Sequence, residues 1–118
     1  MSESARVLTP DGVLTISIVH PFIDQGSFAT YDADAPFVVL GTYYSRRHFT
    51  RTESHGGRVM HFAGWSHPLE DYTAALHATG LVITALREAR PQGPDDAPVI
   101  SHWGQMPVFL WINAKHLP

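Results

Sequence analysis

The stretch VLTISIVHPF, residues 13–22, decides the fold of this chain, because it predicts a buried strand that stops at a proline. Valine, isoleucine and threonine dominate residues 13–19, and apolar side chains fall on both faces of the strand. A strand that is apolar on both faces is typical of the centre of a covered sheet. Pro21 ends the strand, since proline has no N–H group to donate to a ladder. We therefore expect an α/β fold built around this strand.

Turn-forming residues indicate where the structural elements on either side of this strand begin and end. Residues 3–8 (ESARVL) indicate the last turns of a helix, which Thr9-Pro10-Asp11-Gly12 ends. Residues 24–42 are rich in turn formers, and we expect them to form an irregular loop. Residues 43–64 predict an inserted β-hairpin that acts as a cap, with Gly56-Gly57 available for the positive φ angles of its turn.

The second half of the chain predicts one main helix and two more buried strands. His67 is a possible N-cap, Pro68 suits the first helical position, and Gly80 supplies the C-terminal stop. LVITALR (81–87) and PVFLWINA (107–114) have the apolar, β-branched composition of covered strands.

The number of helices is too small for three covered strands, which need a helical layer on both faces. One helix and one helix stump cannot supply both layers. Charged residues make up only 16% of the chain, against roughly 25% in an ordinary domain, which also indicates a covered surface. We therefore expect a partner: either a second chain or another copy of this chain in a homodimer.

Composition excludes several classes of protein. With 118 residues the chain is one domain, residues 1–118, and without cysteine it has neither disulfides nor thiolate metal sites. The net charge is −3 and the basic residues are scattered, so we expect no nucleic-acid partner. No segment approaches the ~18 apolar residues of a membrane span, so we expect a cytoplasmic protein. The eight histidines lack ligand spacing, and solvated histidines are expected rather than a metal site.

Three phrases of the sequence follow one another in an order that resembles a known family. They are Ala5-Arg6-Val7-Leu8-Thr9-Pro10-Asp11-Gly12 with Ser17-Ile18-Val19-His20-Pro21, His67-Pro68-Leu69-Glu70-Asp71-Tyr72 continuing to Arg90-Pro91, and Pro107-Val108-Phe109-Leu110 with Ala114-Lys115. Together they resemble the C-terminal half of class I S-adenosylmethionine-dependent methyltransferases that act on small molecules. The resemblance covers nearly the whole chain.

The resemblance implies a truncated Rossmann-like sheet, in which the last of three strands lies antiparallel between the other two. It also implies S-adenosylmethionine as cofactor and a small-molecule methyl acceptor. The family binds its cofactor through a glycine-rich turn after the first strand, and this sequence has no Gly-x-Gly phrase. The chain would then be a substrate-side half that is inactive alone. The alternative is a non-enzymatic, dimeric module that binds a small ligand or serves assembly.

His20 is the candidate catalytic residue, because α/β sheets place ligand sites at the carboxyl ends of their strands. An imidazole there could orient or deprotonate an acceptor hydroxyl; alternatively, it only ends the strand. The side chains expected to bind substrate lie at this corner, on the hairpin and after residue 98: Pro21, Phe22, Tyr43, Trp65, His67, His102 and Trp103. The hairpin aromatics could instead pack on the sheet. Arg46, Arg47 and Arg51 could bind an acidic group or form a solvated face.

Overall fold

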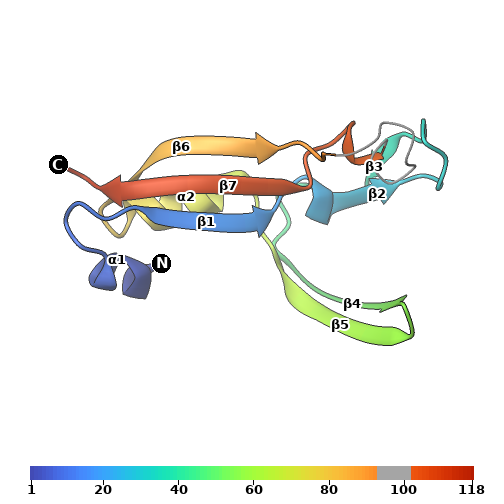
Figure 1. The fold of residues 1–118 in the computed structure, drawn as a ribbon, viewed down its shortest axis with the longest axis horizontal. Helices are drawn as coiled ribbons and strands as arrows, with labels where there is room; N and C mark the ends of the chain where they lie inside the picture. Colours follow the sequence, from blue (N-terminus) through green and yellow to red (C-terminus); the bar gives the residue numbers. More distant parts are fainter. Residues whose placement is uncertain (93–101) are drawn as a thin grey trace.

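The computed structural model describes residues 1–92 and 102–118, which form a three-stranded sheet, two hairpins and two short α-helices (Figure 1). The elements in chain order are α1 (Ser2–Val7), β1 (Leu14–Val19), the 3₁₀ helix η1 (Ile23–Gln25), β2 (Gly26–Phe28), β3 (Phe37–Val39), β4 (Arg47–His55), β5 (Arg58–Ser66), α2 (Leu69–His77), β6 (Leu81–Ala89) and β7 (Phe109–His116).

The central sheet has the strand order β1-β7-β6, and β7 runs antiparallel to both neighbours. Ile112 of β7 pairs with Ile16 of β1 on one side and with Leu86 of β6 on the other. The expected order of the three strands, with the last strand in the middle, is therefore observed.

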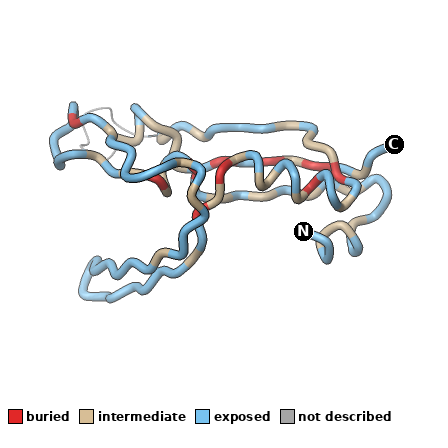
Figure 2. The backbone as a smooth tube through the Cα atoms, turned by 180° about the vertical axis from the view of Figure 1, so that it is seen from behind, coloured by how far each residue is buried: buried red, intermediate tan, exposed pale blue. Residues whose placement is uncertain are grey.

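One face of this sheet carries the hydrophobic core, and α2 lies across it (Figures 1 and 2). Its buried side chains come from α2, β6 and β7: Leu76, Leu81, Leu110, Ile112 and Ala114. Ala5 and Leu8 add contacts from α1 and the residue after it. Burying a leucine side chain contributes roughly 1.5–3 kcal/mol, so each leucine of this small cluster adds appreciably to stability.

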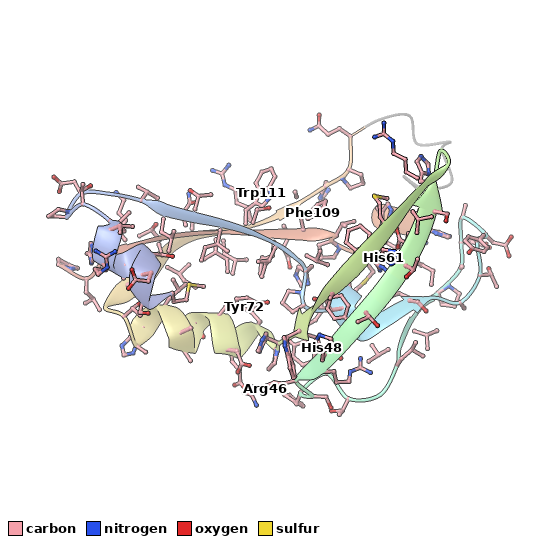
Figure 3. All side chains as sticks on the ribbon, turned by 90° about the horizontal axis from the view of Figure 1, so that it is seen from below. Arg46, His48, His61, Tyr72, Phe109 and Trp111 are labelled. Carbon is pink, nitrogen blue, oxygen red and sulfur yellow. The ribbon has the colours of Figure 1, made fainter. Side chains whose placement is uncertain are left out.

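The opposite face of the sheet is open in the part of the chain that the structure describes. Phe109 and Trp111 point away from the face that α2 covers (Figure 3), and their exposed fractions are 47% and 46%. Val19, which pairs with Phe109, is 41% exposed. The sequence predicts strands that are covered on both faces, whereas residues 1–92 and 102–118 cover only one. The reason is the one anticipated from the sequence: too few helices.

The start of α2 differs in detail from the expectation. Pro68, with φ −63° and ψ 155°, is the N-cap residue rather than the first helical residue. The His67 side chain does not cap the helix but contacts Asp71 instead. The Leu69 N–H donates to the Tyr43 hydroxyl at 2.8 Å, so a residue distant in sequence satisfies one of the free donors. Gly80 ends the helical segment with φ 75°, as predicted.

Residues 24–42 are more ordered than an irregular loop. They begin in η1 and form a second small sheet, in which β2 and β3 pair antiparallel from Gly26 opposite Val39 to Phe28 opposite Phe37. The Phe28 and Phe37 rings meet edge to face with centroids 5.3 Å apart. The expectation of a loop was wrong here, because three-residue strands are too short to show a sequence period.

The predicted hairpin is present, and we call β4, β5 and their turn (residues 47–66) the arm. The expected bounds were 43–64, so the hairpin starts four residues later and ends two residues later. Gly56 and Gly57 form its two-residue turn with φ 57° and 75°, as the sequence predicts. The arm extends away from the central sheet (Figures 1 and 2), and nearly all of its residues are exposed. Its aromatics therefore do not pack on that sheet.

Candidate functional site

His20 lies directly after β1 and is almost fully buried, with 2% of its surface exposed. Its backbone N–H donates to the Val108 carbonyl at 2.7 Å, which extends the pairing of β1 with the β7 side. Its ring Nδ1 accepts the Phe22 N–H at 3.2 Å, and Nε2 lies 2.9 Å from Glu88 Oε1. Because Nδ1 is an acceptor, the neutral ring carries its proton on Nε2 and donates it to Glu88.

This geometry gives His20 a positioning role at the corner. The His20 ring connects the turn at Phe22, through Nδ1, to Glu88 near the end of β6, through Nε2, so both ring nitrogens have hydrogen-bond partners. Glu88 is 54% exposed, so Nε2 is the nitrogen that a rearrangement could free. Proton transfer by His20 stays a prediction, and it requires the bond to Glu88 to open first.

A cavity of about 240 Å³ lies beside this corner, between η1, β3, the segment that joins β3 to the arm and the residues before β7. Its lining residues are Phe22, Gln25, Phe37, Val39, Tyr43 and Met106. An engineered cavity of ~150 Å³ holds benzene, so this space is large enough for an aromatic ring system. The Phe22 and Tyr43 rings meet edge to face with centroids 5.2 Å apart and form one corner of the wall.

Two of the residues predicted to bind substrate, Phe22 and Tyr43, therefore share this cavity. Pro21 is fully buried and is not among the lining residues. Three lining residues were not predicted: Gln25, Phe37 and Val39 lay in the segment expected to be a loop. Met106 was also missed, and no sequence signal marks it.

The other predicted residues lie outside the cavity wall. Trp65 is 58% exposed and packs edge-on against His48 of the neighbouring strand. His102 stacks on Phe28 with ring centroids 4.4 Å apart and contacts the Asp32 carbonyl oxygen, while Trp103 meets the same phenylalanine edge to face. Their role in substrate binding stays a prediction.

His67 belongs instead to a charged cluster at the base of the arm. Its Nδ1 lies 3.0 Å from Asp71 Oδ2, and Arg46 donates to the same carboxylate through Nε at 2.6 Å and through Nη2. Figure 3 shows Arg46 beside the start of α2. The hydrogen bond from Arg46 lowers the pKa of Asp71 to about 2, and His67 acts in the same direction. The cluster fixes the base of the arm to α2.

Buried Gln25 connects the cavity to the arm. It is 1% exposed, its amide Nε2 donates to the Ser45 carbonyl at 3.5 Å, and its Oε1 accepts from Arg47 Nη2 at 3.0 Å. A glutamine that lines the cavity is therefore hydrogen-bonded to Arg47 of the arm, which is not itself a lining residue. Among the residues described, there is no group of three or more histidine, aspartate or glutamate side chains arranged to hold a metal ion.

No protein-family model and no curated protein sequence matches this chain. A solved structure has a similar fold. It is the crystal structure of a provisionally assigned S-adenosylmethionine-dependent methyltransferase from Listeria monocytogenes, with a TM-score of 0.69 and 20% sequence identity. The match covers 99% of this chain and 53% of that chain.

At this identity the comparison establishes a shared fold and nothing about shared chemistry. The chain spans about half the length of the Listeria protein. The α/β architecture described above is therefore similar to part of a methyltransferase fold. Within the described residues, neither α-helix is long and apolar enough to cross a bilayer.

Proposed function

We propose that this chain forms the acceptor side of an S-adenosylmethionine-dependent small-molecule methyltransferase. In this proposal a different stretch of polypeptide, in the same or another chain, supplies the cofactor-binding side. The observation that carries the proposal is the structural similarity, which covers nearly all of this chain and only about half of the Listeria protein. The three sequence phrases that resemble the family support the same assignment.

The residues present do not fit S-adenosylmethionine. The family motif needs a glycine-rich turn between a strand and a helix. Here the glycines with positive φ are Gly41, the arm's turn pair Gly56-Gly57, and Gly80, which precedes a strand rather than a helix. The 240 Å³ cavity is also lined almost wholly by apolar groups and lacks a carboxylate for ribose hydroxyls. We therefore assign no step of cofactor binding to this chain.

In the proposal, the cavity beside Phe22 and Tyr43 receives the methyl acceptor. Its apolar walls remove a flat, uncharged part of the acceptor from water, and the hydrogen bonds of His20 hold the Phe22 turn in place. Methyl transfer depends mainly on holding the reacting atoms in line, so a fixed acceptor pocket is a substantial contribution.

The open face of the sheet supports the need for a second stretch of polypeptide. Phe109, Trp111 and Val19 form an exposed apolar surface, and β1 pairs with only one strand within the described residues. Apolar surface of this kind is typical of an interaction site. In the proposal, the cofactor-binding side continues the sheet at β1 and covers these three side chains.

A dimeric, non-enzymatic module that binds a small ligand is the second candidate. The open face of the sheet favours this second candidate, because another copy of the chain could cover that face as well as a different partner could. The two candidates differ in one respect that can be measured: only the first gains methyl transfer when its partner is present.

The test is to isolate the tagged chain from its native cells with whatever it binds, and to assay transfer of radiolabelled methyl from S-adenosylmethionine to small aromatic acceptors. We expect transfer by the complex and none by the chain purified alone. Trp111→Lys, which places a charge in the open face, should abolish both the complex and the transfer. Arg58→Gln at the tip of the arm is the matched control and should keep both. A complex that neither binds S-adenosylmethionine nor transfers methyl would overturn the proposal.

A further inference from the structure

The arginines near the cavity differ in whether a carboxylate neutralises them. Arg46 is bound to Asp71, and Arg51 Nε lies 2.8 Å from Glu53 Oε1. Within residues 1–92 and 102–118, Arg47 has no carboxylate within salt-bridge distance, and its Nη2 donates to the neutral amide oxygen of Gln25 at 3.0 Å. Of these three arginines, Arg47 is therefore the one that no carboxylate of the described residues neutralises.

The position of this guanidinium is fixed by buried structure. Gln25 lines the cavity, its Nε2 donates to the Ser45 carbonyl oxygen at 3.5 Å, and its Oε1 accepts from Arg47 Nη2 at 3.0 Å, so Arg47 lies one side chain away from the cavity wall. A guanidinium has five N–H donors, and one of them is used here. The remaining donors suit a planar anion such as a carboxylate, which arginine binds through two parallel hydrogen bonds.

The nearest carboxylate on η1, Asp24, interacts with a different arginine. Burial raises the pKa of Asp24, and the charge of Arg51 acts in the opposite direction. The charge of Arg51, and not that of Arg47, is the one that acts on the Asp24 carboxyl. Arg51 also lies over the Phe62 ring at 5.6 Å, which adds to its fixed position on the arm.

The arm is more positively charged than the rest of the chain. Three arginines and one glutamate give the arm a net charge of +2, whereas the whole chain carries −3, so the remaining residues together carry −5. A small region of positive charge on an otherwise acidic protein attracts anions to that region and repels them elsewhere.

We infer that the cavity and Arg47 together bind a flat apolar compound that carries a carboxylate, with its ring system in the cavity and its carboxylate on Arg47. This inference rests on the proposed function, because it names the class of methyl acceptor. The volume of about 240 Å³ admits a bicyclic ring, given that ~150 Å³ is enough for benzene. The apolar walls favour the ring, and Arg47 selects the anion.

The test is calorimetric titration of the 118-residue chain with 1-naphthoate and with 1-naphthamide, its neutral isostere. No methyl donor is needed, so failure here is distinguishable from failure of the proposed methyl transfer. We expect naphthoate to bind at least about tenfold more tightly than the amide, since a charge-assisted bidentate contact is among the strongest in proteins. Arg47→Gln should remove the preference for naphthoate over naphthamide. Arg47→Lys should keep a smaller preference, because lysine retains the positive charge but cannot form the two parallel hydrogen bonds of a guanidinium.

Two further variants serve as controls. Arg58→Gln lies at the arm's tip and should leave the preference unchanged. Val39→Phe should fill the cavity and weaken both compounds by a similar factor; Val39 is 56% exposed, so the larger side chain is tolerated. Circular dichroism establishes that each variant is folded. Equal affinity for the two compounds, no binding of either at millimolar concentration, or a preference that survives Arg47→Gln would each overturn the inference.

Discussion

At the scale of single residues, His20 has a structural role at the corner after β1. Its Nδ1 accepts the Phe22 N–H and its Nε2 binds Glu88. His20→Ala would leave the Phe22 N–H without this acceptor, at a cost of about 1–3 kcal/mol in the free energy of unfolding. Glu88→Gln keeps an oxygen acceptor on a half-exposed side chain and should cost less than ~1 kcal/mol. Urea denaturation measures both variants, and equal losses would contradict the positioning role.

The pH dependence of stability tests the Arg46–Asp71 contact. The folded-state pKa of Asp71 is lowered to about 2 from its usual 3.8, chiefly by the hydrogen bond from Arg46. A lowered carboxyl pKa contributes stability above the unfolded pKa, and that contribution is lost as the pH falls toward the folded value. Stability should therefore fall between about pH 4 and pH 2. Asp71→Asn should flatten this part of the profile, and Arg46→Gln should flatten it too. Parallel profiles for the wild type and both variants would refute the contact.

At the scale of elements, we expect the arm to be the least stable part of the described fold. A two-stranded hairpin alone in water is marginally stable, and most of the arm has no neighbour among the described elements. Replacing Gly56 and Gly57 by alanine forces positive φ on residues with a Cβ, at roughly 1–2 kcal/mol each. We expect faster amide exchange throughout the arm in this variant and unchanged exchange in β1, β6 and β7. An equal increase in the central sheet would mean that the arm supports the core.

The sequence was sufficient for elements with a strong period or clear turn residues. The apolar runs at 13–19, 81–87 and 107–114 predicted three strands, and the structure has strands at all three places. Glycines at positions 56–57 predicted the hairpin turn. The strands β2 and β3 could not be predicted, because three residues carry no period and their pairing depends on tertiary contacts. The direction of the arm depends on contacts at its base, such as Arg46 with Asp71, and no local pattern encodes them.

The candidate site was predictable only in part, for a similar reason. The corner after β1 was located by the general rule that ligands bind at strand ends, and Phe22 and Tyr43 line the cavity there. Gln25, whose buried amide holds Arg47, lay in a segment without a motif. The separate environments of Arg46, Arg47 and Arg51 follow from which carboxylates the fold brings close, and composition alone does not reveal that.

At the scale of the whole molecule, the open face of the sheet predicts self-association when the chain is purified without a partner. Phe109 and Trp111 expose close to half of their surface beside Val19. Sedimentation equilibrium should show species larger than 13.1 kDa that increase with concentration. Trp111→Lys should shift the chain to the monomer while changing its unfolding free energy by less than about 1 kcal/mol, since the side chain is half exposed already. A wild-type chain that remains monomeric at all concentrations would contradict this reading of the open face.

Calorimetric titration of the purified chain with S-adenosylmethionine is a direct test of the proposal that this chain provides an acceptor side and no cofactor site. The chain has no glycine-rich strand–turn–helix phrase, and the walls of the cavity beside Phe22 and Tyr43 are apolar. We therefore predict no saturable heat up to about 1 mM S-adenosylmethionine, which corresponds to a binding free energy weaker than about −4 kcal/mol. Saturable binding by the chain alone with a dissociation constant in the low micromolar range would contradict the account.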